Sequence, residues 1–152
     1  MAKPAKLVLD TSAMVEDFFE GTAMIGIVTA QPAYRFCWML NNHFDINFIR
    51  DPEQNLTSQK KDKEKKENQY QFPIYQYDMP NSSHKYTLYK LKNGSESLLP
   101  ETKQMDYLWL IQTANSEEDA MLIVNELKNI PDVQLAQILV PDQLKSLNNL
   151  LV

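Results

Sequence analysis

The segment from Met105 to Thr113 constrains the fold more than any other part of the chain, because it is almost continuously apolar. A run of this length and composition is typical of an interior strand that is covered on both faces. The segment follows a loop that contains Pro100, and three acidic residues come shortly after it, where Ser116 could cap a helix. The sequence therefore predicts a central strand between a loop and a helix, with one small domain packed around it.

Two main helices are expected, over residues 33–44 and 117–129. The first follows Pro32, a residue that favours the start of a helix. Its apolar side chains form two stripes at helical spacing. The main stripe holds Ala33, Tyr34, Cys37, Trp38, Leu40, Asn41 and Phe44, and the second holds Phe36, Met39 and His43. A helix that is apolar on two sides is either deep in the fold or contacts a partner subunit through its second stripe.

Alternating and β-branched runs predict strands elsewhere in the chain. Single strands are expected at residues 6–10, 23–29, 46–50 and 133–139, and an antiparallel hairpin at residues 70–77 and 85–91. Within these strands, Pro73 predicts an edge or a bulge, and Gly26 predicts a bulge or the close approach of another backbone.

Together, these elements predict an α+β domain over residues 1–152 with a mainly antiparallel sheet and the two main helices on one face. The element order resembles a ferredoxin-like plan of βαβ units with an inserted hairpin.

The segment at about 55–69 is predicted to be a solvated, charged loop. Residues 58–68 contain no apolar side chain and so have nothing to bury. Nucleic-acid binding through its lysines is the alternative, but three acids interleave the five lysines and no aromatic or arginine is available for stacking. The net charge of −5 also disfavours nucleic-acid binding, because phosphate contacts need an excess of basic residues.

Several classes of protein are disfavoured by what the sequence lacks. Its three glycines, Gly21, Gly26 and Gly94, cannot build a P-loop or a dinucleotide-binding fingerprint. Two histidines and one cysteine without ligand spacing predict no metal site, and we expect no cofactor. Cys37 lies on an apolar stripe, where cysteine is usually a core residue and not a nucleophile.

The expected location is the cytoplasm. No apolar run approaches the roughly 20 residues that a membrane span requires. The apolar part of the N-terminal segment, Leu7–Leu9, is too short for a signal peptide. A single cysteine fits a reducing compartment, since no intrachain disulfide can form. We therefore expect a soluble protein with no membrane association.

The stretch Leu99–Tyr107 resembles the signature of the IPExxxVDY family of small, uncharacterised proteins from Bacteroidota-type bacteria. Leu99 replaces the signature isoleucine and Met105 replaces the valine, both apolar for apolar. Residues 25–27, 34–41 and 144–151 also look like parts of that family, so the resemblance covers most of the chain. The family carries no assigned activity, and the resemblance therefore implies no mechanism.

Two functional hypotheses remain from the sequence. The first is a non-enzymatic protein-interaction or self-associating module, as a homodimer or with a protein partner, whose interface would use Phe36, Met39 and His43. The alternative is a small-molecule-binding or enzymatic domain.

In that alternative, the site would lie near Arg35, Glu101, Asp106 and Tyr107. Glu101 and Asp106 could form a carboxylate pair for acid–base chemistry, and Arg35 could clamp an anion or an acidic partner. We favour structural roles, in which Glu101 accepts backbone hydrogen bonds, Asp106 caps or salt-bridges at the strand start, and Tyr107 packs. Arg35 would then pair with Glu101, Asp106 or Asp17.

Overall fold

Strand β9 (Tyr107–Gln112) lies in the interior of an antiparallel sheet, between β1 (Ala23–Thr29) and β6 (Lys85–Lys90). Trp109 is paired with Ile25 of β1 on one side and with Leu88 of β6 on the other. Because side chains alternate along a strand, β9 contributes to both faces of the sheet, and its residues 107–111 are at most 2% exposed. This confirms the prediction of an interior strand covered on both faces.

The computed structural model describes residues 18–50, 56–61, 67–80, 82–94, 96–141, 144 and 146–150, and at 56–61, 67–70 and 148 it describes the backbone alone. The main sheet in this part of the chain has six strands in the order β10-β1-β9-β6-β5-β2, with every neighbouring pair antiparallel. The outer strands are β10 (Val133–Leu139), β5 (Ile74–Asp78) and β2 (Ile49–Arg50).

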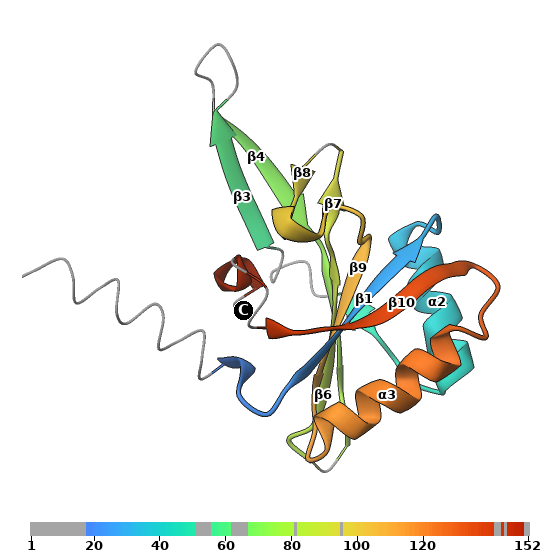
Figure 1. Ribbon diagram of the computed structural model, residues 1–152. Coiled ribbons are helices and arrows are strands. Elements are labelled where there is room, and N and C mark those ends of the chain that lie inside the picture. Colours follow the sequence, from blue (N-terminus) through green and yellow to red (C-terminus); the bar gives the residue numbers. More distant parts are fainter. Residues whose placement is uncertain are drawn as a thin grey trace, which may run out of the picture.

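In the described part of the chain, two small ribbons and the 3-10 helices η2 and η4 accompany the main sheet (Figure 1). One ribbon pairs β3 (Leu56–Lys61) with β4 (Glu67–Phe72), and the other pairs β7 (Lys92–Asn93) with β8 (Glu96–Ser97). The 3-10 helices are η2 (Pro100–Thr102) and η4 (Leu147–Leu150).

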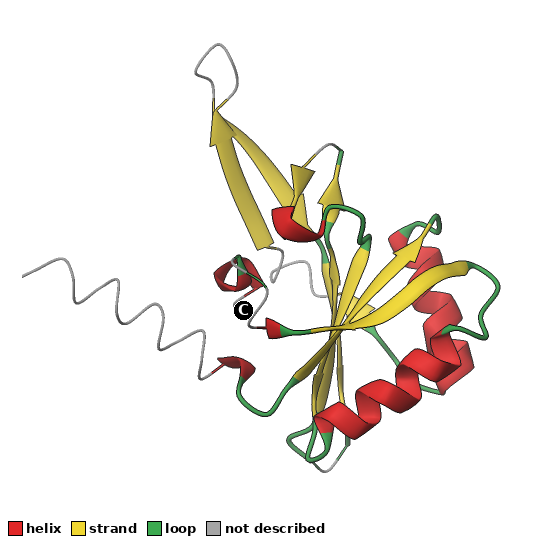
Figure 2. Ribbon diagram, viewed as in Figure 1, coloured by secondary structure: helices red, strands yellow, loops and turns green. Residues whose placement is uncertain are grey.

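Helices α2 (Ala33–Phe44) and α3 (Ser116–Leu127) cover one face of the sheet, as Figure 2 shows. α2 follows Pro32 and ends at Asp45, which is left-handed with φ 56° and donates its N–H to the carbonyl of Asn41. The Asn41 side chain then accepts the N–H of Phe48 at 2.7 Å, which fixes the chain as it leaves the helix. Both predicted helices are present, with α2 at the predicted bounds.

The start of α3 differs in detail from the prediction. Asn115, and not Ser116, occupies the capping position, and Ser116 is the first helical residue. The Ser116 hydroxyl accepts the backbone N–H of Thr113 at 2.9 Å, and the Thr113 hydroxyl donates to Asp119 at 2.6 Å. These bonds join the end of β9 to the first turn of α3, where acidic side chains suit the positive end of the helix dipole.

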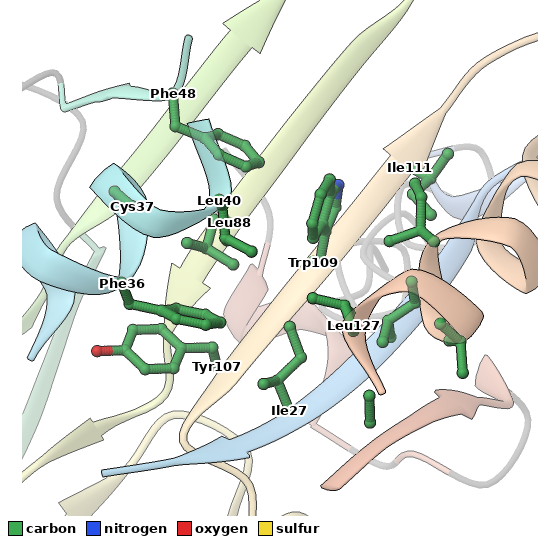
Figure 3. Close-up of a cluster of buried hydrophobic side chains, with 14 of the residues drawn as sticks. Ile27, Phe36, Cys37, Leu40, Phe48, Leu88, Tyr107, Trp109, Ile111 and Leu127 are labelled. Carbon is green, nitrogen blue, oxygen red and sulfur yellow. The ribbon is translucent and has the colours of Figure 1, made fainter. Parts of the chain in front are cut away.

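The core between sheet and helices is centred on Trp109. Figure 3 shows its ring on β9 with α2 residues on one side and Leu127 of α3 on the other. The rings of Phe44, Phe48 and Tyr86 approach Trp109 edge-on, with centroids at 5.2, 5.2 and 5.3 Å. Edge-to-face contacts of this kind add to the stabilisation from burial. α2 and α3 therefore pack on the sheet in one hydrophobic core, to which α3 contributes aliphatic side chains such as Leu127.

A second core lies on the opposite face of the sheet. Leu108 and Leu110 of β9 pack there with Leu99 beside η2 and Leu150 in η4. The hydroxyl of Tyr89 donates to the carbonyl of Leu150 at 2.9 Å, which ties the C-terminal part of the described chain to β6. This cover explains why β9 is apolar along its whole length.

The α+β class and the mainly antiparallel sheet are confirmed. The predicted hairpin is present as β5 and β6, and Pro73 separates β4 from β5. The ferredoxin-like plan stays an interpretation: the helical connections and the order β10-β1-β9-β6 suit it, while β5 and β2 extend the sheet beyond it. The predicted strand at residues 6–10 lies outside the described residues.

Two predictions about individual segments are wrong. Residues 56–61 and 67–69 are strands and not part of a loop; residues 62–66 lie outside the described part. Gly26 is regularly paired on both sides, and the irregularity in β1 falls at Val28/Thr29 instead. The close approach at Gly26 is made by a side chain, because a Cβ added there would lie 2.9 Å from the Met105 sulfur.

Candidate functional site

Asp106 and Tyr107 hold the loop that joins β1 to α2. The Asp106 carboxylate accepts the N–H of Thr29 at 3.0 Å and pairs with Lys92 at 3.1 Å through its other oxygen. The Tyr107 hydroxyl donates to the carbonyl of Gln31 at 2.8 Å. The two side chains thus bond the backbone at the end of β1 and in the loop that follows it, which is a structural arrangement.

The environment of Tyr107 suits a neutral hydrogen-bond donor. Its ring is 2% exposed and lies against Phe36, with a centroid distance of 4.7 Å. Burial raises the pKa of Tyr107 well above its ordinary value, and the nearby Cys37, Tyr75 and Asp106 raise it further. The hydroxyl therefore keeps its proton and its bond to Gln31 at neutral pH.

Glu101 and Arg35 do not share the surroundings of Asp106 and Tyr107. Glu101, in η2, accepts the backbone N–H of Ser146 at 2.5 Å, as a structural role predicts. Arg35 is exposed on α2 and makes no ion pair with Asp106, which is paired with Lys92 instead. Asp17, another predicted partner of Arg35, lies outside the described residues. None of Arg35, Glu101, Asp106 and Tyr107 lines any of the pockets reported below.

The predicted interface stripe on α2 is wrong at Phe36, which is fully buried against Tyr107. Met39 is partly buried and packs on the core. His43 is more accessible, and its Nε2 lies 3.0 Å from a carboxylate oxygen of Glu126 on α3. The stripe thus runs from the core to the surface and is not an interface as a whole.

Two large aromatic side chains of α2 are exposed instead. Tyr34 is 78% exposed and Trp38, one helical turn further along, is 64% exposed. Residues four apart lie on the same side of a helix, so the two rings share one surface. We call Tyr34 and Trp38 the α2 aromatic patch. Their spacing groups both residues with Ala33, Cys37 and Leu40, which are buried, so no signal in the sequence separated the exposed members of the main stripe from the buried ones.

An open depression adjoins the α2 aromatic patch. It has a volume of about 340 Å³ and is lined by Trp38, Met39, Asn42, His43, Asn129, Ile130 and Pro131. The depression lies between α2 and the turn that follows α3, next to the contact of His43 with Glu126. An exposed indole beside a hollow with apolar walls is the kind of surface at which proteins bind one another.

Two further pockets were considered as possible catalytic sites. One of about 320 Å³ surrounds the first turn of α3, from Asn115 to Glu118. Another, of about 260 Å³, contains His84, Tyr86 and Asp119, but the carboxylate of Asp119 already accepts the Thr113 hydroxyl. Burial raises the pKa of Tyr86, with a further contribution from Asp119. The bond between Thr113 and Asp119 joins the end of β9 to the first turn of α3, so we assign these two side chains a structural role.

Metal and thiol chemistry find no support in the described part of the chain. It contains no group of three or more His, Cys, Asp or Glu side chains placed to hold a metal ion. Burial raises the pKa of the Cys37 thiol to about 12, so the thiolate is scarcely formed at neutral pH. The thiol behaves as a core group of α2.

Comparisons with protein-family models, with curated proteins and with solved structures found no match. The resemblance to the IPExxxVDY family therefore stays a prediction. Among the described residues, no helix has the length and apolar character that crossing a membrane would require.

Proposed function

We propose that this chain is a non-enzymatic protein-interaction module that binds its partner through the α2 aromatic patch and the adjoining depression. The observation that carries the proposal is the exposure of Trp38, 64%, and of Tyr34, 78%, one turn apart on the same helix. Tryptophan and tyrosine are enriched among the residues that dominate binding energies, because they bury a large area at a small cost in conformational entropy.

The chemistry around the patch defines the partner. The depression would take an apolar side chain, since Met39, Ile130 and Pro131 form part of its wall. Arg35 lies three residues before Trp38 on the exposed side of α2 and would attract a carboxylate. The partner we infer is therefore a protein segment that presents a large apolar residue close to an acidic one.

The alternative, a small-molecule or enzymatic site near Arg35, Glu101, Asp106 and Tyr107, has weaker support. Asp106 and Tyr107 bond the loop between β1 and α2, and Glu101 bonds the chain at Ser146. We place the interaction in the cytoplasm, in keeping with a single, buried cysteine.

The test is a selection of displayed random peptides against the whole protein. Trp38 and Trp109 are the two tryptophans, and Trp109 is 0% exposed, so a change in emission on binding reports Trp38. We expect selected peptides that combine an apolar residue with an acidic one. Measured by the anisotropy of a fluorescently labelled peptide, which does not require Trp38, their affinity should fall about tenfold or more in Trp38→Ser and less in Arg35→Ala.

The matched control is Leu122→Ser, which removes an equally exposed apolar side chain from α3, outside the patch. Its affinity for the selected peptides should equal that of the original protein. Peptides that bind Trp38→Ser as tightly as the original protein would refute the proposal, as would a selection that enriches none.

A further inference from the structure

The two edges of the main sheet are very different. At one edge, β2 consists of the two residues Ile49 and Arg50. At the other edge, β10 runs for seven residues and pairs with β1 alone among the described strands. An edge strand presents a row of unpaired N–H and C=O groups, and short or charged edges are protected against pairing with another chain. β2 is protected by its short length. β10 is long, so its exposed edge needs another explanation.

The sequence of β10 lacks the usual protective features. Residues 133–140 contain no charged residue, no proline and no glycine. The one irregularity is at Gln134, where the register shifts so that Val133 and Leu135 face neighbouring residues of β1. From Leu135 to Leu139 the pairing with β1 is regular, so five consecutive residues without a bulge offer their outer edge.

Apolar side chains accompany this edge. Leu135 is 42% exposed, Ile138 44% and Val140 47%. On the helix side, Ile138 and Val140 line a pocket of about 270 Å³ together with Met121 of α3, which is 60% exposed. Met121, Ile138 and Val140 therefore form one exposed apolar surface, and surfaces of this kind often mark sites of protein contact.

We propose that β10 pairs in antiparallel fashion with β10 of a second copy of this chain. The two sheets of six strands would then join into one continuous sheet of twelve across a two-fold axis. With the axis perpendicular to the sheet, both copies keep their helices on the same side, and Met121 of each copy approaches the axis beside Ile138. This interface is distinct from the proposed function, because it shares no residue with the α2 aromatic patch.

The neutral composition of β10 favours a second copy over another partner. In a two-fold antiparallel pairing, β10 of one copy lies against the identical β10 of the other copy. A charged residue in the middle of β10 would therefore lie close to the same charge on the second copy. Five uncharged residues, Leu135–Leu139, avoid this repulsion in every register. The exposed amides of Gln134 and Gln137 can also bond to polar groups across the axis.

The test measures mass in solution by sedimentation equilibrium over a range of concentrations, with the full chain. We expect a monomer of 17.7 kDa in equilibrium with a species of twice that mass. Gln137→Lys should weaken dimerisation about tenfold or more, because two lysines would face one another near the axis. Asn125→Lys, an equal change of charge at an exposed position on α3, should leave it unchanged.

Hydrogen exchange of the unaltered protein gives an independent measure, which holds even if the lysine variant folds poorly. Amide protection at residues 135–139 should rise with protein concentration, while protection at Ile49–Arg50 should not. A monomer at all concentrations, a polydisperse aggregate, or a dimer that Gln137→Lys leaves intact would each overturn the proposal. A dimer lost in Trp38→Ser but not in Gln137→Lys would place self-association on α2 instead. Peptide binding by a Gln137→Lys monomer separates this interface from the proposed function.

Discussion

The hydroxyl of Tyr107 donates a hydrogen bond of 2.8 Å to the carbonyl oxygen of Gln31, across 76 positions of sequence. Gln31 belongs to the loop that ends β1 and precedes Pro32 at the start of α2. The adjacent Asp106 accepts the N–H of Thr29, the last residue of β1. The Asp-Tyr pair that the sequence offered as a possible site thus sets where α2 begins relative to the sheet.

Tyr107→Phe tests that relationship directly. The change removes the hydroxyl and leaves the ring on Phe36, so the carbonyl of Gln31 loses its partner in a partly buried position. We expect the free energy of unfolding, from urea denaturation, to fall by about 1–2 kcal/mol. Tyr34→Phe, at a position 78% exposed, should change it by less than about 0.5 kcal/mol. Equal effects of the two substitutions would contradict the structural role.

Asp106 can be tested with a pair of substitutions. Asp106→Asn retains an oxygen for the N–H of Thr29 and loses the charge that pairs with Lys92, which is partly exposed. We expect it to lower the free energy of unfolding by about 1 kcal/mol or less, since exposed ion pairs contribute little. Asp106→Ala leaves the Thr29 N–H without a partner and should cost about 1–3 kcal/mol. If both variants unfold at the same urea concentration, the bond to Thr29 has no structural importance.

Much of the fold could be predicted because its strongest signals are local. The apolar run of β9 requires cover on both faces. Pro32 and the helical spacing of the apolar residues that follow it predict α2. The rotation of α2 about its axis is not local. Apolar side chains occur nearly all round this helix, so the choice of Phe36 over Trp38 for burial depends on where the loop after β1 is held.

Two other features, the ribbon of β3 and β4 and the exposure of the α2 aromatic patch, could not be predicted from apolar patterns. β3 and β4 pair although their sequence is highly polar, because a two-stranded ribbon is joined by backbone hydrogen bonds. The α2 aromatic patch could not be predicted either, because its exposure follows from the rotation of α2, which depends on contacts distant in sequence. Tyr34 and Trp38 were identified as apolar, and only the packed helix distinguishes an exposed aromatic from a buried one.

Cys37 makes stability depend on pH in the alkaline range. Burial raises the pKa of its thiol from 9.0 to about 12, so the folded state favours the neutral thiol. Its contribution is complete below about pH 9, where the thiol is also neutral in the unfolded chain, and it is lost as the pH rises towards 12. We expect the difference in free energy of unfolding between the original protein and Cys37→Ala to shrink over this range. Tyr89 titrates alike in both proteins and cancels in the comparison, because burial alone raises its pKa.

A chemical measurement checks the same thiol without a substitution. At pH 8, iodoacetamide should alkylate Cys37 slowly in the folded protein and rapidly in urea, because the folded thiol is 5% exposed and protonated. Fast alkylation of the folded protein, or a difference from Cys37→Ala that stays constant up to pH 12, would contradict the assigned environment.

Gly26 lies at a point of β1 where the side chains of Met105 and Leu139 leave no room for a Cβ. A Cβ at this position of β1 would lie 2.9 Å from the sulfur of Met105 and 3.2 Å from a methyl carbon of Leu139. Gly26→Ala should therefore lower the free energy of unfolding by about 1–2 kcal/mol, because a closely packed core resists added volume.

A second substitution separates the steric contact with Met105 from a general effect of replacing glycine on the backbone. Adding Met105→Leu, which shortens the side chain that meets the new methyl group, should restore part of the loss, so the two changes would be non-additive. Gly94→Ala is the contrasting control: Gly94 has φ 62° and open space around its Cβ position, so its cost of about 1 kcal/mol comes from backbone strain alone. Met105→Leu should leave that cost unchanged. If it relieves both alanine variants equally, the contact between Gly26 and Met105 does not explain the glycine.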